Sequence, residues 1–377
     1  MKAIQIQGDS PQEIKKELDK ILADGHHPTL ALAFVPFKME VEPISEVLEK
    51  HNISVFGIST FGSTYEDPIT QSSISILLLD LNPDYFKIIY KEHIAESPES
   101  TAASLAKEIS AHFENPGILI YTSDFSINFT NILKRFTDEF GMDVNMFGAI
   151  AGNDVGIAEG FVFTNQRKSK KGIMALAFNS DKLEMKGDAF SGWKSVGTIK
   201  TVTKSSNTEI FEIDGKPAID ITMKYSGINE LPEDWFEANI LVSRTLSMNF
   251  LRENREPVTL MGLLNMENRS MITQANCPVG TKVQFALPPE FEVIDETINR
   301  FGQLQKETPD TDAVILYSCM NRLDVLGPFV NDEVKGIRKL WDAPLVGFMS
   351  NGEIGRAKGG ELEIHNCTSI CVTLKEK

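Results

Sequence analysis

Runs of apolar residues alternate with amphipathic stretches along the chain, and this alternation predicts strands and helices in turn. In the middle of the chain, Ile118–Thr122 reads as a strand, and Ile127–Phe140 carries apolar residues at helical spacing. A second strand is expected within Val144–Gly152, and two more follow at Gly160–Asn165 and Ile173–Phe178. A strand, a helix and a strand in this order predict two parallel strands joined by a right-handed crossover.

The same order recurs towards the C-terminus. A strand is expected at Ala313–Ser318, a helix around Val334–Trp341 and a second strand within Leu345–Gly352. Two further strands follow at Gly360–Asn366 and Ser369–Leu374. Glycines are expected just beyond a strand at Gly148 and Gly152 and at Gly347 and Gly352, and likewise at Gly57 and Gly62 nearer the N-terminus. There they would allow tight turns or close approach of a ligand.

A fainter version of the pattern lies near the N-terminus, with strands expected at Thr29–Val35, Ser54–Gly62 and Ile74–Leu81 and a helix around Ile44–His51. Self-similarity of this kind indicates repeated supersecondary units. We therefore predict an α/β fold of mixed α/β and α+β character. It would have two layered domains with mixed β-sheets covered by helices, built from three related β-α-β-containing units.

The region between the second and third units, about Leu183–Pro288, follows a different pattern. It contains short strand-like runs at Val196–Thr203, Glu209–Ile213 and Lys282–Phe285, and a helix is expected within Lys216–Tyr225. We interpret this region as a strand-rich connector.

Charge and composition narrow the classes of partner. The chain has 377 residues, of which 37 are Lys or Arg and 53 are Asp or Glu, so its net charge is −16. This balance argues against nucleic acid and anionic membranes as partners, because both attract positive surfaces. No apolar stretch approaches the roughly 20 residues of a membrane-spanning helix. The four cysteines form no C-x-x-C pair, and we expect a reducing, cytoplasmic location.

The common catalytic signatures are missing from the sequence. The segment Gly57–Thr64 is similar to a P-loop, but Ser63 replaces the lysine that contacts the β- and γ-phosphates, so a nucleotide site is not expected. No dinucleotide-binding, zinc-protease or hydrolase motif occurs either. We therefore expect neither an enzyme nor a metal site, and no cofactor.

Polar residues gather where the two parallel strands of the C-terminal unit end. The first strand runs into Ser318–Arg322 and the second into Ser350–Gly355, so parallel neighbours would bring these loops together. Arg322 would then pair with Glu353 to fix the two loops, or clamp an anionic ligand. The residues that we assign to a ligand pocket are Ser318, Cys319, Arg322, Ser350, Asn351, Gly352, Glu353, His365, Asn366 and Trp193.

Three of these residues have alternative interpretations. Cys319, beside a cation and in one unit with His365, could be the nucleophile of a thiol-dependent enzyme or a small buried apolar residue. His365 could instead sit in a hairpin turn with its imidazole hydrogen-bonded. Trp193, between two glycines, could stack on a ligand or pack between sheets.

Several of these segments together resemble the FIST-domain family. The similarity starts near residue 28 and spans nearly the whole chain. The segments that carry it are Gly192–Gly197, Thr201–Lys204 and Asp214–Ala218 in the connector, and Ser318–Arg322, Val346–Gly355 and His365–Thr368 in the C-terminal half.

The resemblance implies an intracellular sensory protein with an N-terminal half at residues 1–222 and a C-terminal half at 223–377. Members of the family are fused to histidine kinases, chemotaxis receptors, cyclic-dinucleotide enzymes and F-boxes. No such domain occurs here, so we expect a separate signalling partner such as a histidine kinase or a cyclic-dinucleotide enzyme. Small ligands such as amino acids are implied.

Some bacterial members are described as haem-binding nitric-oxide sensors, and here His365 or Cys319 would be the axial ligand. The loop Gly57–Ser63 departs from the family pattern, because it lacks a Cys after its first glycine and a Glu after its second.

Overall fold

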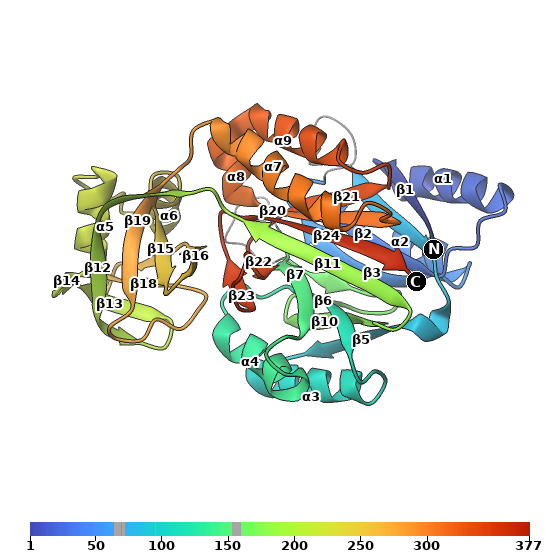
Figure 1. Cartoon of the computed structure of the whole chain (residues 1–377), viewed down its shortest axis with the longest axis horizontal. Helices are drawn as coiled ribbons and strands as arrows, with labels where there is room; N and C mark the ends of the chain where they lie inside the picture. The colour runs from blue at the N-terminus through green and yellow to red at the C-terminus, as the bar shows by residue number, and fades with distance from the viewer. Residues whose placement is uncertain (64–68, 70–71, 95, 153–159) are drawn as a thin grey trace.

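The chain forms a large body and a small lobe that lies to one side of it (Figure 1). The computed structural model describes residues 1–63, 69, 72–94, 96–152 and 160–377, so Thr64 of the glycine-rich segment lies outside the described residues. The small lobe runs from the start of β12 to the end of β19, residues 194–287, and the remaining residues form the body. Because the lobe is an insertion, the body is built from chain on both sides of it.

Three parallel strand pairs organise the body, and each is joined by helical crossover segments. Every strand of these pairs is almost fully buried, which explains why each one is an apolar run and does not alternate apolar with polar residues. The pairs are β2 (Leu30–Pro36) with β3 (Ser54–Thr60), β6 (Pro116–Thr122) with β7 (Asn145–Ile150), and β20 (Ala313–Cys319) with β21 (Leu345–Ser350).

Each pair is extended in the same way by two antiparallel strands. The strand orders are β1-β4-β2-β3, β5-β10-β6-β7 and β11-β24-β20-β21. The mixed sheets and covering helices confirm the predicted α/β class, whereas construction from three related β-α-β-containing units stays a prediction. The added strands are β1 (Lys2–Gly8), β4 (Ile74–Asp80), β5 (Phe86–Glu92), β10 (Gly172–Asn179), β11 (Leu183–Phe190) and β24 (Ser369–Glu376).

The three sheets hold one another through short strands that cross from one to the next. β8 (Val162–Phe163) pairs with β3 and continues to β9 (Lys168–Ser169), while β22 (Glu353–Gly355) pairs with β7 and with β23 (Glu363–His365). An isolated bridge between Ser63 and Phe348 links the first sheet to the third. Between the sheets, the buried hydroxyls of Tyr121 and Tyr317 lie 3.1 Å apart.

Helices cover the outer faces of the sheets (Figure 1). Polar caps begin several of them: the side chain of Ser10 accepts a hydrogen bond from Glu13 N, and that of Asn128 accepts one from Asn131 N. No helix among the described residues is long and apolar enough to cross a membrane. The helices are α1 (Pro11–Ala23), α2 (Glu42–Glu49), α3 (Pro98–Ser110), α4 (Phe129–Phe140), α7 (Glu292–Glu307), α8 (Met320–Leu326) and α9 (Val330–Arg338), with 3-10 turns at Pro83–Tyr85 and Gly327–Phe329.

Three glycines expected beyond strands lie inside them instead: Gly57 in β3, Gly148 in β7 and Gly347 in β21. Close packing explains two of these positions. A Cβ on Gly148 would lie 1.9 Å from the carbonyl oxygen of Ile120, and one on Gly57 would overlap the ring of Phe163. These two glycines therefore serve strand packing and not a turn.

The small lobe is built on antiparallel strands with two helices. Its predicted strands at 196–203, 209–213 and 282–285 are present, and the predicted division at residues 222 and 223 falls inside α5. The elements are β12 (Lys194–Ser206), β13 (Glu209–Ile213), β14 (Lys216–Pro217), α5 (Ala218–Ser226), α6 (Trp235–Ser243), β15 (Ser247–Arg252), β16 (Arg255–Leu260), β17 (Leu263–Asn265), β18 (Ser270–Ile272) and β19 (Lys282–Leu287).

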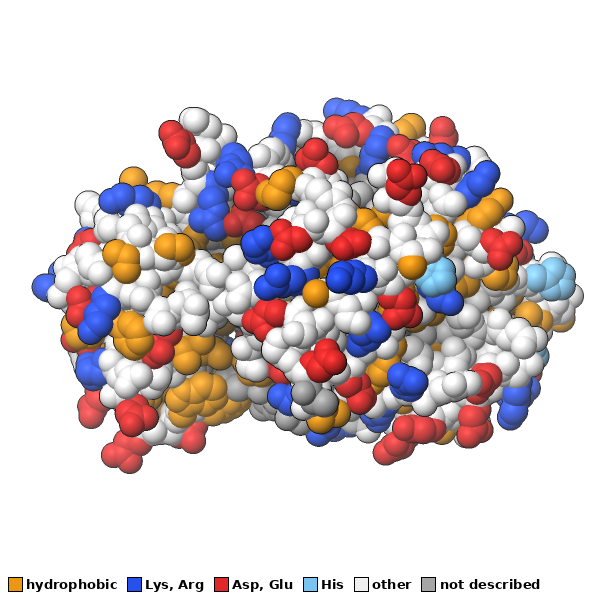
Figure 2. Space-filling view, turned by 90° about the horizontal axis from the view of Figure 1, so that it is seen from below, with side chains coloured by type: hydrophobic (Ala, Val, Ile, Leu, Met, Phe, Trp, Pro, Cys, Tyr) orange, Lys and Arg blue, Asp and Glu red, His pale blue; other side chains and the backbone are white. Residues whose placement is uncertain are grey.

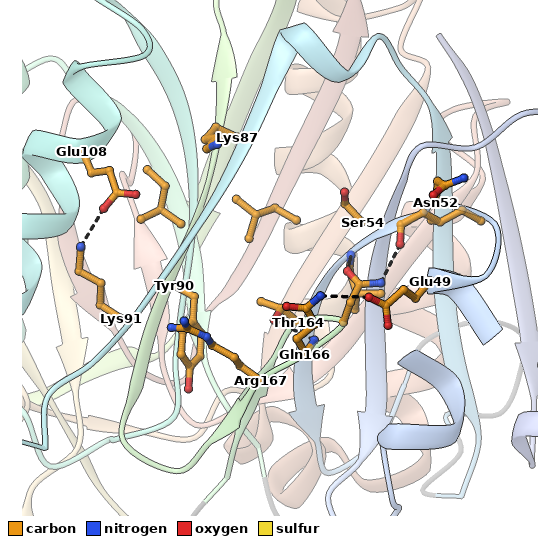
Figure 3. Close-up of a pocket in the computed structure, with 15 residues that line it drawn as sticks. Glu49, Asn52, Ser54, Lys87, Tyr90, Lys91, Glu108, Thr164, Gln166 and Arg167 are labelled. Atoms are coloured by element: carbon orange, nitrogen blue, oxygen red, sulfur yellow. Dashed lines mark hydrogen bonds and ion pairs between the residues drawn. The ribbon is translucent and has the colours of Figure 1, made fainter. Parts of the chain in front are cut away.

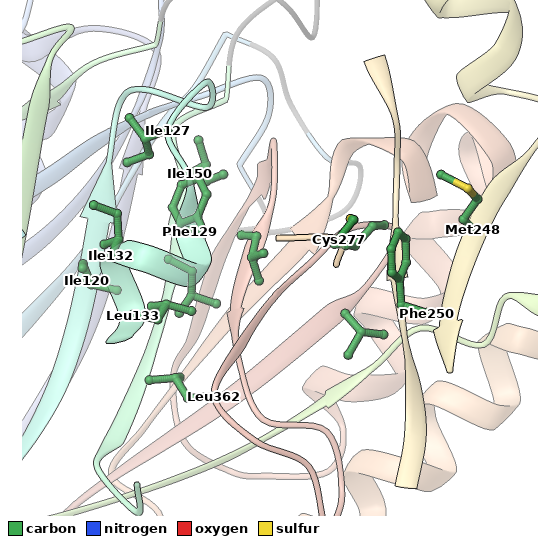
Figure 4. Packing of buried hydrophobic residues seen from close by; sticks show 14 of the residues in the cluster. Ile120, Ile127, Phe129, Ile132, Leu133, Ile150, Met248, Phe250, Cys277 and Leu362 are labelled. Carbon is green, nitrogen blue, oxygen red and sulfur yellow. The ribbon is translucent and has the colours of Figure 1, made fainter. Parts of the chain in front are cut away.

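Apolar packing and ion pairs together attach the lobe to the body. One cluster of buried side chains extends from Phe129 and Ile132 on α4 to Phe250 and Cys277 in the lobe (Figure 4). Charged pairs lie across the same boundary, which is more polar than a domain core. They are Arg300 with Glu256, Arg252 with Glu363, Arg255 with Glu361, and Arg244 with Asp324.

Away from this boundary, the face of the lobe seen in Figure 2 carries several apolar side chains, whereas the body mixes cations and anions. Among the exposed large apolar residues of the lobe are Ile199, Trp235, Leu241 and Val279.

Candidate functional site

The carboxyl ends of β20 and β21 lie side by side, as the sequence predicts. Cys319 and Ser350 are direct partners across the parallel pair, so the loops that follow them emerge together. These loops face the small lobe, and the boundary encloses a cavity of about 70 Å³. Its side-chain lining comes from the body through Cys319, Met320, Asn321, Asp324, Ser350 and Asn351, and from the lobe through Asn239, Ile240, Ser243, Met261 and Leu263.

Glu353 is buried just behind the residues that line the cavity. It is the first residue of β22, and Ser350 Oγ donates a 2.6 Å hydrogen bond to its Oε1. Its Oε2 has no hydrogen-bond partner among the described residues. Burial, and then the neighbouring Cys319 thiol, raises the pKa of this carboxyl well above its usual value. The raised pKa favours the protonated form of Glu353, which can donate a hydrogen bond.

Arg322 pairs with Glu333 and not with Glu353. The side chain is fully buried in the first turn of α8, and its guanidinium meets both carboxylate oxygens of Glu333 on α9, with Nε 3.1 Å from Oε1. It also donates to Ser191 O at 2.6 Å and to Thr297 Oγ1 at 3.0 Å. These partners occupy the N–H groups of the guanidinium, so Arg322 links α7, α8 and α9 inside the protein.

The thiol of Cys319 is buried beside that of Cys367. Burial, and then the nearby Cys367, raises the pKa of Cys319 well above its usual value. A nucleophilic cysteine needs the opposite shift, because the thiolate is the reactive form. Cys367 in turn lies 3.3 Å from Ser247 Oγ of the lobe. The geometry favours the interpretation of Cys319 as a packed cavity wall.

Three other predicted residues lie in the interior. Ser318 Oγ lies 3.2 Å from Ser369 Oγ, which places it behind the cavity. A Cβ on Gly352 would lie 2.8 Å from Ile150 Cδ1, so no side chain fits there. Trp193 is 6% exposed, and the Arg322 guanidinium lies 5.6 Å from its ring centroid. This contact is a cation–π interaction inside the protein.

Asn366 connects the body to the lobe. Its backbone N–H donates to Thr259 O at 2.9 Å, and its side-chain oxygen accepts from Met261 N at 3.0 Å. Its side-chain nitrogen donates to Gln274 Oε1 at 2.8 Å. Asn351 makes a comparable link inside the body, from its side-chain nitrogen to Ala151 O at 2.9 Å, while it also lines the cavity.

The described residues around His365 do not fit a haem. The imidazole is buried, its Nε2 lies 3.3 Å from Gly355 O, and burial lowers its pKa, so it is neutral. It does not line the cavity, whose volume of about 70 Å³ is too small for a group as large as haem, which would need a pocket of roughly 300–1,000 Å³. Cys319 does line this cavity, but the same small volume leaves no space for a macrocycle.

The sequence predictions missed half of the cavity wall. Asn321 and Asp324 follow Cys319 on α8, and a helical reading of the segment after Ser318 would have included them. Asn239, Ser243 and Met261 come from the lobe, and their place beside β20 and β21 depends on how the lobe docks.

The comparisons with known proteins match two consecutive parts of the chain, and the boundary between the two matches falls inside the small lobe. Residues 29–216 match the FIST N domain, and residues 229–356 match the FIST C domain. No curated protein matches the chain. FIST domains are generally sensory domains of signal transduction. The two matches follow one another and cover most of the sequence, so the chain belongs to the FIST family.

Proposed function

We propose that this protein senses a small polar ligand, such as an amino acid, which it binds in the cavity between the small lobe and the body. The observation that carries the proposal is the convergence of Cys319, Ser350 and Asn351 with Asn239 and Ser243 around one cavity. Ligand sites favour the carboxyl ends of parallel strands and the boundaries between domains, and this cavity is at both.

The chemistry of the lining supports a ligand with both donors and acceptors. The amides of Asn239, Asn321 and Asn351 can donate and accept, and the carboxylate of Asp324 suits an ammonium group. Met261 and Leu263 supply an apolar wall on the lobe side. The small volume favours a compact metabolite over a nucleotide.

The position of the cavity suggests how occupancy would be transmitted. Its walls belong to both parts of the chain, so a ligand that contacts both would favour the docked arrangement of the lobe. The ion pairs Arg244–Asp324 and Arg252–Glu363 hold the same boundary. A separate signalling partner that responds to lobe position, and a cytoplasmic location, are part of this proposal. The four cysteines are free thiols, which supports a reducing compartment.

Thermal unfolding in the presence of single amino acids and small metabolites tests the proposal. A ligand at 100 times its Kd stabilises the native state by about 2.7 kcal/mol and raises the melting temperature. Ser243→Leu should fill the cavity and remove this shift. Ser226→Leu is a matched control on α5, because both serines end a lobe helix and hydrogen-bond a carbonyl of the preceding turn.

The proposal predicts a shift in the wild type and in Ser226→Leu, and none in Ser243→Leu. A shift that persists in Ser243→Leu would place the ligand elsewhere. If no compound in the library changes the melting temperature, ligand sensing in this cavity is wrong.

A further inference from the structure

A second and much larger concave site lies on the body, away from the lobe boundary. It is a groove of about 740 Å³ between β5 on one side and the start of β3 with the β8–β9 turn on the other (Figure 3). The β5 wall is residues 87–91, and the opposite wall consists of residues 52–55 and 164–167. We name it the β5 groove.

β5 is the outermost strand of its sheet, so one side of its backbone faces this groove. Within the described part of the chain it pairs only with β10. His93 N donates to Lys171 O in that ladder, whereas Ser123 N of the β6 side donates to Gly172 O. Peptide groups alternate in direction along an antiparallel strand. The N–H and C=O groups of Ile88 and Tyr90 therefore point away from β10, towards the groove.

The opposite wall has no such free edge at its centre. The side chain of Asn165 accepts a hydrogen bond from Val55 N and donates one to Ile53 O, both at 2.9 Å. These two bonds take the place of those to a neighbouring strand, so the backbone groups of Ile53 and Val55 already have partners. β5 is thus the side of the groove that offers backbone groups to a partner.

The charges of the groove differ from those of the chain as a whole. Lys87 and Arg167 are exposed, and neither has a carboxylate partner among residues 1–63, 69, 72–94, 96–152 and 160–377. Arg167 lies over the ring of Tyr90 at 5.5 Å, which holds it beside β5. Lys91 is paired with Glu108 at 2.7 Å. Glu49 also lines the groove and accepts a hydrogen bond from Gln166 Nε2 at 3.1 Å, so the lining holds three cations and two carboxylates. In a chain of net charge −16, this local excess of cations beside a free strand edge is complementary to an anionic segment.

From this combination we propose that the β5 groove binds an extended acidic peptide, which adds to β5 as a further strand. The peptide backbone would bond to Ile88 and Tyr90, and its carboxylates would meet Lys87 and Arg167. Strand addition takes its affinity from such main-chain bonds and its selectivity from side chains. Residues 87–91 of β5 span roughly 13 Å at 3.3 Å per residue, which suits a recognition segment of about five residues.

Fluorescence anisotropy with two labelled peptides tests the charge preference. The probe is the seven-residue peptide VEEVEEV, and the control is VKKVKKV at the same ionic strength. The wild type should bind the acidic peptide at least about tenfold more tightly, because like charges repel the basic one. Equal binding of both peptides, or no binding of VEEVEEV, overturns the proposal. In either case, the lysines of β5 would serve only to prevent this edge strand from pairing with other chains.

Variants test the two groups of contacts separately. Lys87→Glu with Arg167→Glu should weaken VEEVEEV binding about tenfold or more, since each exposed pair contributes up to about fivefold. Lys216→Glu reverses an exposed charge in the lobe and should leave binding unchanged. Ile88→Pro removes an N–H that faces the groove and none of the bonds to β10, so it should weaken VEEVEEV binding through the loss of a main-chain bond. Circular dichroism of each variant verifies the fold.

A modified peptide makes the test of strand addition independent of folding. VEEVEEV with N-methyl groups at alternate residues keeps its charges but loses the donors of one edge. Two forms of the peptide are compared, each with the methyl groups on the N–H groups of one edge. The form methylated on the edge that faces β5 should not bind, and the other form should bind as the unmethylated peptide does. Equal binding of both methylated forms would show a purely electrostatic contact and overturn strand addition.

Discussion

The buried carboxyl of Glu353 should make the stability of the protein depend on pH in a way that one substitution removes. In the unfolded chain this group has an ordinary pKa near 4.5, whereas burial raises its pKa well above that value in the native state. Between these two pKa values, the native state holds one proton that the unfolded state has released. The free energy of unfolding therefore falls as pH rises through this window, by about 1.4 kcal/mol per pH unit.

Glu353→Gln should remove this dependence, because the amide cannot ionise and still accepts the hydrogen bond from Ser350 through its oxygen. Relative to the wild type, the variant should gain about 1.4 kcal/mol per pH unit above pH 4.5, until the native pKa is reached. Urea unfolding at half-unit steps from pH 4 to pH 8 measures the difference. Taking the difference between the two proteins cancels groups that titrate alike in both.

Glu230→Gln is the control, since it removes an exposed carboxylate of the lobe and should follow the wild-type curve. A difference between Glu353→Gln and wild type that stays constant from pH 4 to pH 8 would refute the reasoning. It would mean that Glu353 ionises in the native state with an ordinary pKa, and that its buried oxygen is stabilised by a group absent from the described contacts.

Three further predictions concern stability and reactivity. Arg322→Leu should cost about 3–5 kcal/mol in urea unfolding, because it leaves the Glu333 carboxylate buried and unpaired, and adding Glu333→Leu should recover much of the loss. A recovery of less than 1 kcal/mol would refute the pairing. Gly148→Ala should destabilise the protein strongly through backbone overlap, whereas Gly302→Ala within α7 should stabilise it by up to about 1 kcal/mol; equal melting temperatures would contradict this. Alkylation of Cys319 by iodoacetamide at pH 8, followed by peptide mass spectrometry, should be negligible until urea unfolds the chain, and rapid native labelling would contradict its raised pKa.

The strand pairs and the meeting of their loops could be predicted from sequence because local patterns determine them. Apolar runs separated by a helical segment imply a parallel pair, and a parallel pair places Cys319 beside Ser350 whatever the rest of the chain does. The same reasoning placed Asn351 at the cavity. These predictions needed no knowledge of distant contacts.

The partner of Arg322 could not be predicted in this way. Glu333 follows Arg322 by 11 residues, Glu353 comes just after the neighbouring strand β21, and the direction of the first turn of α8 decides between them. The residues of the lobe that line the cavity could not be predicted from the sequence either. The apolar residues of α6 are spread around the helix, so its sequence gives no amphipathic stripe that would identify the face it buries. The position of Ser243 beside Asn321, whose side chain donates to Ser243 O at 3.3 Å, follows from long-range docking alone.

The pairing of β22 with β7, which joins the last part of the chain to the second sheet, has a consequence for synthesis of the protein. β7 is complete once residue 150 has been made, yet its partner β22 belongs to the last part of the chain. At the usual rate of about 5–20 residues per second, on the order of 10–40 s pass before the ribosome adds residue 355. Throughout that interval the nascent chain carries an unpaired apolar strand edge, which is prone to pair with other chains. Slowing or truncating synthesis of the C-terminal segment should therefore lower the yield of soluble protein by leaving this earlier sheet open.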